Sequence, residues 1–230
     1  MSMLRAVLFD FNGVISDDEP LHFAALRTVL ETQGVKISEE DYETRFLGKD
    51  DRDCFREALK EKHPPLNGEL LETLIQRKSE AYLHLVDASL RIFPGVASFI
   101  HEAYSACVLA IASGALRREV EFVLDRTDLK HFFSCIVTQE DVSRGKPDPE
   151  IFLTTLAILN RQNHLGKTIV PAECLVVEDS RPGVEAALTA GMHCLAVTNS
   201  FPAARLAAAD KVLPSLEIPP EELRMWIQDW

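Results

Sequence analysis

The sequence predicts an α/β fold in which a doubly wound parallel sheet carries an inserted all-helical segment. Short apolar runs recur along the chain, and each ends at polar or glycine residues, as buried strands do. Helical patterns separate most of these runs, and one long segment shows helical patterns without a strand pattern. Alternating strands and helices indicate a parallel sheet that is covered by helices. The strands are predicted at residues 4–9, 107–112, 135–138, 174–178 and 193–198.

The helices of this core have apolar residues at helical spacing. They are predicted at residues 96–104, 115–125, 149–160 and 182–190. Together with the strands they define a core domain of residues 1–16 and 92–230. The chain is expected to leave and rejoin this core at hinges near Ser16 and Phe93.

Residues 17–91 are predicted to form a helical cap domain. Acidic residues and a proline at residues 18–20 suit the start of a first helix, and Gly34 suits its end. Ser38 and Asp41 resemble a capping box, which indicates the start of a second helix. Two further helices are predicted at residues 51–61 and 69–88.

Composition places the chain among globular proteins and limits its partners. It has 230 residues, of which 47% are hydrophobic, and this is enough for a sizeable core. The formal net charge of −12 argues against nucleic acid as a partner, because neutralising phosphates requires basic patches. No stretch approaches the ~20 apolar residues of a membrane span. Because Asp10 also interrupts the first apolar run, we expect no signal peptide, no membrane partner and a cytoplasmic protein.

The five cysteines show no CxxC spacing. Four of them lie in apolar, strand-like runs, so the pattern indicates buried free thiols in a reducing compartment. A nucleophilic cysteine is the alternative.

Acidic side chains directly follow two of the predicted strands. Asp10 ends the first apolar run, and Glu178 and Asp179 end the run that begins at Cys174. The carboxyl ends of parallel strands meet at the edge of the sheet where ligands bind, so we expect these three carboxylates to lie close together. Their charges repel one another unless a hard cation such as Mg2+ lies between them. Asp10 is also the candidate nucleophile for phosphoryl transfer, with a metal-ligand or helix-capping role as the alternative.

Three further residues suit the binding of a phosphoryl group. Ser113 and Gly114 follow the strand at 107–112, and Ser113 can donate to a phosphoryl oxygen near a helix start. The alternative for Ser113 is an ordinary helix N-cap. Lys146 lies in a proline-bounded turn, where it can neutralise the charge of Asp10 and of the transferred group. A solvated loop lysine is the alternative for this position.

In their order along the chain, these segments and the inserted cap resemble the haloacid dehalogenase superfamily of aspartate-nucleophile hydrolases, with its Rossmann-like core. The resemblance covers essentially the whole chain and is closest to the β-phosphoglucomutase-like and small-phosphatase branch. The segments that suggest this branch are residues 18–22, Gly48, residues 77–82, residues 93–95 and the segments around Lys146 and Glu178. The resemblance implies a small phosphorylated substrate, and we expect a monomer or weak homodimer. It also implies Mg2+ held by Asp10, the backbone carbonyl of Asn12 and Asp179, with Glu178 assisting, and phosphoryl contacts from Ser113, Gly114 and Lys146.

Four cap residues are candidates for substrate binding, namely His22, Lys49, Arg52 and Lys78. Lys78 falls on the apolar stripe of its helix, where a charge requires a reason. It either reaches the substrate, as in the resembling branch, or carries its ammonium past the cap core to water. For His22 the alternative is helix packing. Arg52 lies one residue further from Gly48 than the sugar-phosphate arginine of the mutases, which favours a hydrolase over a mutase.

Asn12 departs from the pattern of the superfamily, whose phosphatases and mutases mostly carry a second aspartate at this position. That aspartate protonates the leaving oxygen and later activates the attacking water or hydroxyl. An amide does neither, and loss of general acid–base catalysis typically costs about 10²–10⁴ in rate.

Four explanations of Asn12 remain open. The first is a phosphatase that is slow or is helped by another group such as His22. The second is a leaving group that needs no proton, as in dehalogenase or phosphonatase chemistry. The third is a phosphate-binding pseudoenzyme. The fourth is an engineered Asp→Asn change, or an asparagine that deamidation converts to aspartate.

From these observations we expect a Mg2+-dependent hydrolase of small phosphate monoesters, sugar-phosphate-like, that acts through an aspartyl-phosphate at Asp10. A β-phosphoglucomutase-type phosphotransferase is the alternative. In either case a closing cap is expected to exclude water and select the substrate.

Overall fold

The structure is a computed structural model that describes residues 3–61, 66–162, 166–228 and 230. It divides into two compact units, the core (residues 1–17 and 92–230) and the cap (residues 18–91).

The core is built on a parallel sheet of six strands in the order β3-β2-β1-β4-β5-β6. The strands are β1 (Ala6–Phe9), β2 (Val108–Ala112), β3 (Phe133–Val137), β4 (Cys174–Glu178), β5 (His193–Val197) and β6 (Lys211–Leu213). The chain runs outward from β1 through β2 to β3 and then returns to β4 on the other side of β1. Ligands of doubly wound folds bind at such a switch point. The sheet confirms the predicted fold class.

Three strands differ clearly from the sequence prediction. β1 begins at Ala6, two residues after the predicted start at Leu4. β3 begins at Phe133, two residues before the predicted start at Cys135. The strand β6, Lys211–Leu213, was not predicted, because it is only three residues long and only partly buried. Such a short run at the edge of a sheet carries too little apolar periodicity to be recognised.

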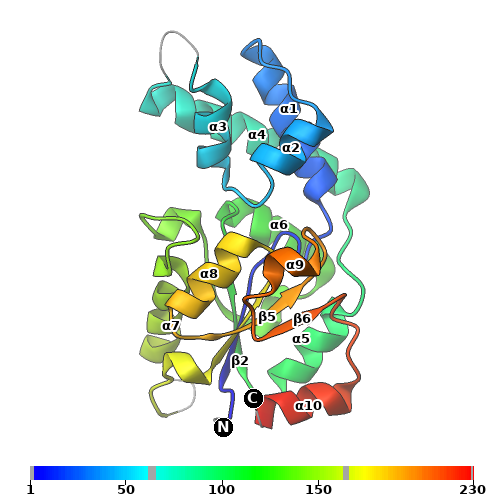
Figure 1. The fold of residues 1–230 in the computed structure, drawn as a ribbon, viewed down its shortest axis with the longest axis vertical. Coiled ribbons are helices and arrows are strands. Elements are labelled where there is room, and N and C mark those ends of the chain that lie inside the picture. The colour runs from blue at the N-terminus through cyan, green and yellow to red at the C-terminus, as the bar shows by residue number, and fades with distance from the viewer. Residues whose placement is uncertain (1–2, 62–65, 163–165, 229) are drawn as a thin grey trace. The chain divides into compact units, whose positions relative to one another are not determined.

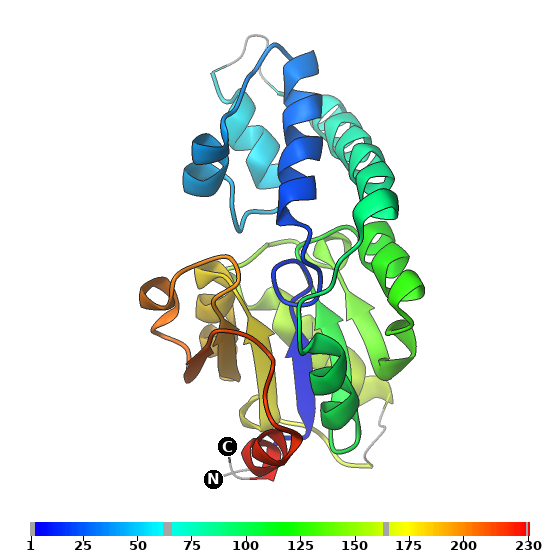
Figure 2. The same ribbon diagram turned by 90° about the vertical axis from the view of Figure 1, so that its right-hand side faces the viewer.

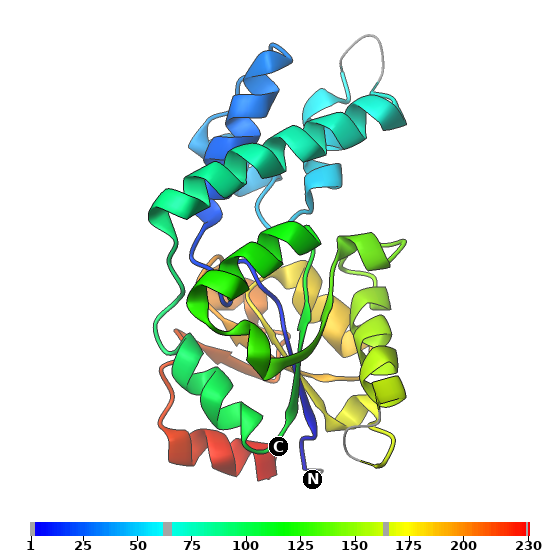
Figure 3. The ribbon, with the colours of Figure 1, turned by 180° about the vertical axis from the view of Figure 1, so that it is seen from behind.

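Helices cover both faces of the sheet. In the core they are α5 (Val96–Tyr104), α6 (Arg117–Thr127), α7 (Glu150–Gln162), α8 (Arg181–Thr189), α9 (Ala203–Leu206) and α10 (Pro220–Gln228). Short 3-10 turns are η1 (Lys130–Phe132), η2 (Gln139–Asp141) and η3 (Pro171–Glu173). α7 and α8 lie on the face seen in Figure 1, and α5, α6 and α10 lie on the face seen in Figure 3. α9 and α10 were not predicted from the sequence.

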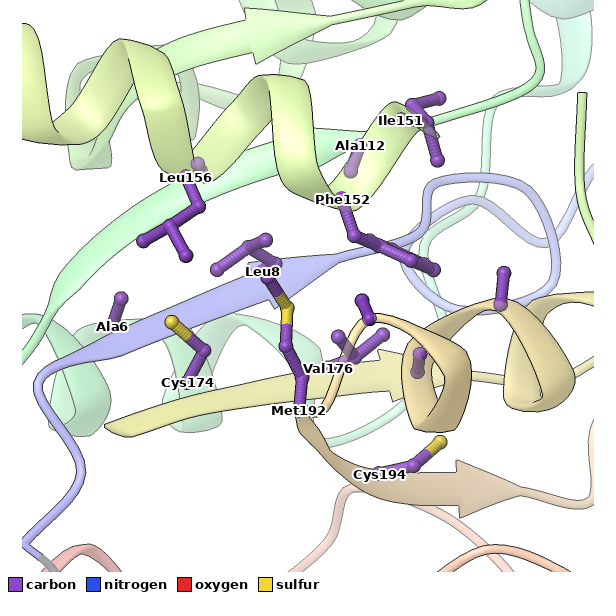
Figure 4. Close-up of a cluster of buried hydrophobic side chains, with 14 of the residues drawn as sticks. Ala6, Leu8, Ala112, Ile151, Phe152, Leu156, Cys174, Val176, Met192 and Cys194 are labelled. Atoms are coloured by element: carbon purple, nitrogen blue, oxygen red, sulfur yellow. The ribbon is translucent and has the colours of Figure 1, made fainter. Parts of the chain in front are cut away.

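Side chains of β1 alternate between two apolar cores, as the period of a strand requires. Ala6 and Leu8 belong to the cluster beneath α7 and α8, where Leu8 lies below Phe152 (Figure 4). On the opposite face, the ring of Phe9 packs edge-on against Phe99 of α5, with 5.7 Å between the ring centroids. β1 is therefore buried on both faces and continues directly into the loop at residues 10–16 (Figure 2).

The regular secondary structure of the cap, in its described residues, consists of helices alone. Its helices are α1 (Glu19–Thr32), α2 (Glu39–Arg45), α3 (Asp51–Leu59) and α4 (Gly68–Ser89). α1 and α4 pack against each other, as the blue and the cyan-to-green helices of Figure 2 show. The predicted capping box is confirmed, because Ser38 Oγ accepts from Asp41 N at 3.1 Å and Asp41 Oδ2 accepts from Ser38 N at 2.9 Å. α3 ends at Leu59, two residues before the predicted end.

The chain segments that leave and rejoin the core pair with each other. Ser16 forms an isolated antiparallel bridge with Ile92, and Phe93 N donates to Ile15 O at 3.0 Å. This pairing fixes both ends of the cap insertion to the loop that follows β1. No helix in the described part of the chain combines the length and apolar character that a bilayer crossing requires.

Candidate active site

The parallel register places polar residues of neighbouring strands at one edge of the sheet. Phe9 of β1 is paired with Ile111 of β2 and with Val177 of β4. Asp10 follows Phe9, and its backbone N–H donates to Val177 O at 2.9 Å, which holds it beside the end of β4. Glu178 is the last residue of β4 and is fully buried. The structure thus brings Asp10 and Glu178 together as the strand pattern indicated.

Lys146 joins these two carboxylates. Its Nζ lies 2.8 Å from Asp10 Oδ1 and 2.6 Å from Glu178 Oε1, and the lysine side chain is only 11% exposed. The interpretation of Lys146 as a solvated loop lysine is therefore wrong. An ammonium placed between two buried carboxylates makes charge-assisted hydrogen bonds to both.

Burial and charge together set the ionisation of this group. Burial raises the pKa of Asp10 to about 6, Lys146 opposes that rise, and Glu178 adds to it. For Lys146, burial alone would lower the pKa, but the charges of Asp10 and Glu178 outweigh burial and raise it above its usual range. At neutral pH these shifts favour the ammonium form of Lys146, and the pKa of about 6 favours the carboxylate form of Asp10.

Glu178 is held at both of its oxygens. Oε2 accepts from Asp179 N, Ser180 N and Ser180 Oγ, each at 2.9 Å, while Oε1 faces Lys146. A Cβ on Gly183 would lie 1.8 Å from Oε1, so only glycine leaves room for the carboxylate against the start of α8. Glu178 therefore fixes the position of Lys146.

Asp10, Glu178 and Asp179 form an acidic cluster in which one oxygen of each lies within 4.8 Å of the others. Asp179 packs against the turn that follows Asp10, because a Cβ on Gly13 would lie 1.9 Å from Asp179 Oδ2. Gly13 also has a φ of +75°, which disfavours any residue with a side chain. Since hard divalent cations prefer oxygen ligands, the residues present fit a Mg2+ ion.

Asn199 is a residue of this site that the sequence analysis missed. It follows β5, and its Nδ2 donates to Gly13 O at 2.7 Å, which ties the turn after Asp10 to the neighbouring loop. Its position just beyond the carboxyl end of a predicted strand was the signal available for finding it.

Ser113 lies at the end of β2 and is 1% exposed. Its backbone N–H donates to Val137 O at 3.0 Å, and its Oγ accepts from Ala115 N at 3.1 Å. The interpretation of Ser113 as a helix N-cap is wrong, because α6 begins only at Arg117. Because Ser113 Oγ accepts this hydrogen bond through a lone pair, its hydroxyl hydrogen can still be donated to another group. Gly114 is the next residue in the same turn.

Asn12 lies two residues after Asp10 in the turn that closes on Ser16. It forms an isolated bridge with Ser16, and its side chain is partly buried. The metal and catalytic assignments of Asn12 stay predictions.

Two of the four cap candidates belong to one buried network within the cap. Lys78 Nζ lies 2.9 Å from Asp51 Oδ1 and 2.6 Å from His22 Nδ1. Because an ammonium only donates, His22 Nδ1 accepts, and the ring proton lies on Nε2, 3.7 Å from Asp18 Oδ2. Tyr82 OH donates to the same Asp18 oxygen and stacks on the His22 ring. Lys78, the charged residue on the apolar stripe, is therefore buried and paired, and its ammonium does not extend to water.

The other two cap candidates lie at the surface of the cap. Arg52 Nη1 pairs with Glu72 Oε1 at 2.6 Å, and the arginine side chain is 41% exposed. Lys49 is exposed. The structure therefore does not bring Lys49 and Arg52 into the network of His22 and Lys78.

Burial of the cysteines disfavours a nucleophilic role. All five are free thiols, and burial raises the pKa of Cys107 and of Cys174 to about 12. Burial likewise raises the pKa of the partly exposed Cys135 to about 11. Since the thiolate is the reactive form, these groups are inert at neutral pH.

This chain is similar to known proteins over most of its length. The family model of haloacid dehalogenase-like hydrolases matches residues 7–197. A phosphorylated carbohydrates phosphatase of Thermotoga maritima is 37% identical over 83% of this chain and 83% of its own length. The β-phosphoglucomutase of Bacillus subtilis is 28% identical over 86% of this chain and 85% of its own. The crystal structure of a β-phosphoglucomutase from Clostridium difficile shares the fold, with a TM-score of 0.85, 24% identity, and 98% and 97% of the two chains covered. The chain belongs to the haloacid dehalogenase-like hydrolase family.

Proposed function

We propose that this protein is a Mg2+-dependent phosphatase that hydrolyses small phosphate monoesters, with phosphorylated sugars as the substrate class. The observation that carries the proposal is the placement of Asp10 against Lys146 at the switch point of the sheet, 2.8 Å from its ammonium. A carboxylate held there can act as a nucleophile, and the neighbouring cation can stabilise the charge of a transferring phosphoryl group. The phosphatase name of the Thermotoga maritima relative supports the reaction class and the sugar-phosphate substrate.

In the proposed first step, an oxygen of Asp10 forms a bond to phosphorus while the bond from phosphorus to the leaving oxygen breaks. The leaving oxygen keeps the electron pair, and the product is an aspartyl-phosphate. In the second step, the oxygen of water forms a bond to phosphorus while the bond from phosphorus to Asp10 breaks, so phosphate departs and the carboxylate is regenerated. The proton that water loses passes to solvent and balances the one that the leaving alkoxide takes from solvent. Lys146 and Ser113 hold the phosphoryl oxygens, and Ser113 does so with the hydroxyl hydrogen that its bond to Ala115 leaves unused.

The proposed ion is held by Asp10, the backbone carbonyl of Asn12 and Asp179. Glu178 supports these ligands indirectly, since both of its oxygens already accept hydrogen bonds. When bound, Mg2+ supplies charge that offsets the repulsion between the carboxylates and the incoming phosphate.

Asn12 is expected to slow this reaction without preventing substrate binding. Its amide hydrogen-bonds a leaving group but does not transfer a proton to it. Esters with a good leaving group, such as p-nitrophenyl phosphate, should therefore be hydrolysed faster than sugar phosphates. We expect Asn12→Asp to raise kcat on sugar phosphates by about 10²–10⁴ and to change the rate with p-nitrophenyl phosphate much less.

The test is a panel of sugar phosphates and p-nitrophenyl phosphate, assayed by release of inorganic phosphate with Mg2+ and with EDTA. Asn67→Asp is the matched control, because Asn67 caps α4 in the cap through its side-chain oxygen and aspartate caps equally well. Asp10→Asn should abolish activity. Phosphate binding without turnover in both the native and the Asn12→Asp protein would contradict the proposal. Isomerisation of a sugar phosphate in place of phosphate release would favour the mutase alternative.

A further inference from the structure

The loop that carries Lys146 is closed by one carboxylate at the start of α7. Glu150 Oε1 accepts from Ser143 N at 2.9 Å, and Glu150 Oε2 accepts from Arg144 N at 3.0 Å. Arg144 Nε also lies 3.4 Å from Oε2. Glu150 therefore joins both ends of the segment 143–150, which has Lys146 near its middle.

A second set of bonds fixes the interior of this segment. Glu150 N donates to Asp148 Oδ1 at 3.0 Å, and Asp148 N donates to Gly145 O at 3.0 Å. Prolines at positions 147 and 149 further restrict the backbone dihedral angles. From this fixed backbone the Lys146 side chain extends to Asp10 and Glu178.

We propose that Glu150 is a positioning residue for phosphoryl transfer, because its bonds to two successive backbone N–H groups hold the loop that places the Lys146 ammonium. The inference rests on the proposed function in one respect, namely that Lys146 binds the phosphoryl group. Hydrogen bonds from backbone N–H groups to a carboxylate are charge-assisted and stronger than those between neutral groups. The bond from Ser143 also lowers the pKa of Glu150, so the carboxylate is ionised at neutral pH. Glu150 itself does not touch Asp10 or the substrate.

The variant that tests this role is Glu150→Gln, which keeps the size of the side chain but replaces one acceptor oxygen by an amide donor. One of the two loop N–H groups then loses its partner, and Lys146 shifts. We expect kcat/KM to fall by about 10²-fold, the typical effect of an ångström-scale misplacement. The fall should lie mainly in kcat, because the cation matters most for the charge of the transition state. Glu150→Asp reaches one of the two N–H groups and should recover part of the loss.

Glu173→Gln is the matched control. Glu173 Oε2 accepts from Val170 N at 3.0 Å and pairs with Arg5 at 3.4 Å, so it also joins a backbone N–H to an arginine. Glu173 precedes β4 and therefore lies at the amino ends of the parallel strands, whereas Asp10 lies at their carboxyl ends. We expect Glu173→Gln to change the melting temperature about as much as Glu150→Gln and to leave kcat and KM unchanged.

A double-mutant cycle separates positioning from general loss of structure, with inorganic phosphate as the probe and calorimetry as the readout. Glu150→Gln should weaken phosphate binding about tenfold, a free-energy change of about 1.4 kcal/mol, and should have no further effect when combined with Lys146→Ala. The inference would be overturned if Glu150→Gln weakened phosphate binding equally in the native and in the Lys146→Ala proteins. It would also be overturned if Glu150→Gln bound phosphate with native affinity, or if the native chain did not bind phosphate.

The binding cycle does not require turnover. If the native chain binds phosphate but hydrolyses none of the esters, the proposed function fails while the cycle still decides the role of Glu150.

Discussion

Replacement of Lys146 by methionine tests the electrostatics on which the site depends. Lys146→Met keeps the length of the side chain and removes the ammonium that touches Asp10 at 2.8 Å and Glu178 at 2.6 Å. Removing one partner of a buried ion pair typically costs about 3–5 kcal/mol. Glu178 retains three donors at its other oxygen, and the Asp10 side chain is 13% exposed, so we expect the lower limit, about 3 kcal/mol. For a chain of this length that corresponds to a fall in Tm of about 6–12 °C.

The loss of stability should depend on pH in a defined direction. The pKa of Asp10 is raised to about 6 although Lys146 opposes the rise, so removing Lys146 raises it further. A carboxyl group whose pKa is raised by folding stabilises the folded state below its unfolded pKa, and this contribution is lost as the pH rises through the folded pKa. The Tm difference between the native and Lys146→Met proteins should therefore be largest near pH 7.5 and smaller near pH 5. Added Mg2+ should restore part of the Tm at pH 7.5.

Thermal unfolding monitored by circular dichroism, in EDTA and in Mg2+, provides the measurement. Lys130→Met is the matched control, because Lys130 also faces two carboxylates, Asp125 at 3.0 Å and Glu121 at 3.9 Å, but its side chain is 42% exposed. Exposed ion pairs contribute about 0–1 kcal/mol, so the control should change Tm only slightly. Equal Tm values for the two variants at pH 7.5, or a difference that grows at pH 5, would refute the reasoning.

Three further predictions concern the glycine beside Glu178, the buried network of the cap, and pH. Gly183→Ala places a Cβ 1.8 Å from Glu178 Oε1 and should lower kcat/KM, measured by phosphate release, by about 10²-fold through displacement of that carboxylate. Asp51→Asn removes the negative charge that lies 2.9 Å from the buried Lys78 ammonium and should lower the unfolding free energy, measured in urea, by about 3 kcal/mol. Because the raised pKa of Asp10 is about 6, kcat/KM at limiting Mg2+ should fall as the pH drops below about 6 and should level off above it.

Two control variants accompany the predictions for Gly183 and Asp51. Gly68→Ala adds a Cβ that meets nothing within 4 Å and should leave kcat/KM unchanged. Glu72→Gln breaks the exposed pair with Arg52 and should cost no more than about 1 kcal/mol. Native kinetics in the Gly183 variant, native stability in the Asp51 variant, or a kcat/KM that does not fall below pH 6 would each contradict the corresponding prediction.

The sequence was sufficient to locate the carboxylates because strand periodicity is a local property. A run of buried residues that ends in an acid predicts its own place at the edge of a parallel sheet, and Asp10 and Glu178 lie there in register. The same reasoning did not reach β6, whose three residues are too few to show a period.

Contacts between distant parts of the chain were beyond this kind of reasoning. Lys78 was recognised as an unusual charge on an apolar stripe, but its partner Asp51 lies on another helix and carries no signal of its own. Two other contacts were likewise not predicted from the sequence. Glu150 closes the Lys146 loop, and Asn199 donates to Gly13. A carboxylate or amide that faces solvent and one that organises a loop look alike in a sequence, because the difference lies in which backbone groups they meet.

The structure also narrows the explanations of Asn12. His22 was the candidate for the missing acid–base group, yet its Nδ1 accepts from Lys78 and its Nε2 faces Asp18, so both ring nitrogens are engaged within the cap. In the core, the charges of Asp10 and Glu178 raise the pKa of Lys146, which makes this ammonium a poor proton donor at neutral pH. Lys146, one of the two proposed phosphoryl ligands, thus contacts Asp10, and Ser113, the other, follows β2, while the residue at position 12 is an amide that does not titrate. In the proposed reaction, protonation of the leaving group is therefore the step that Asn12 should slow most.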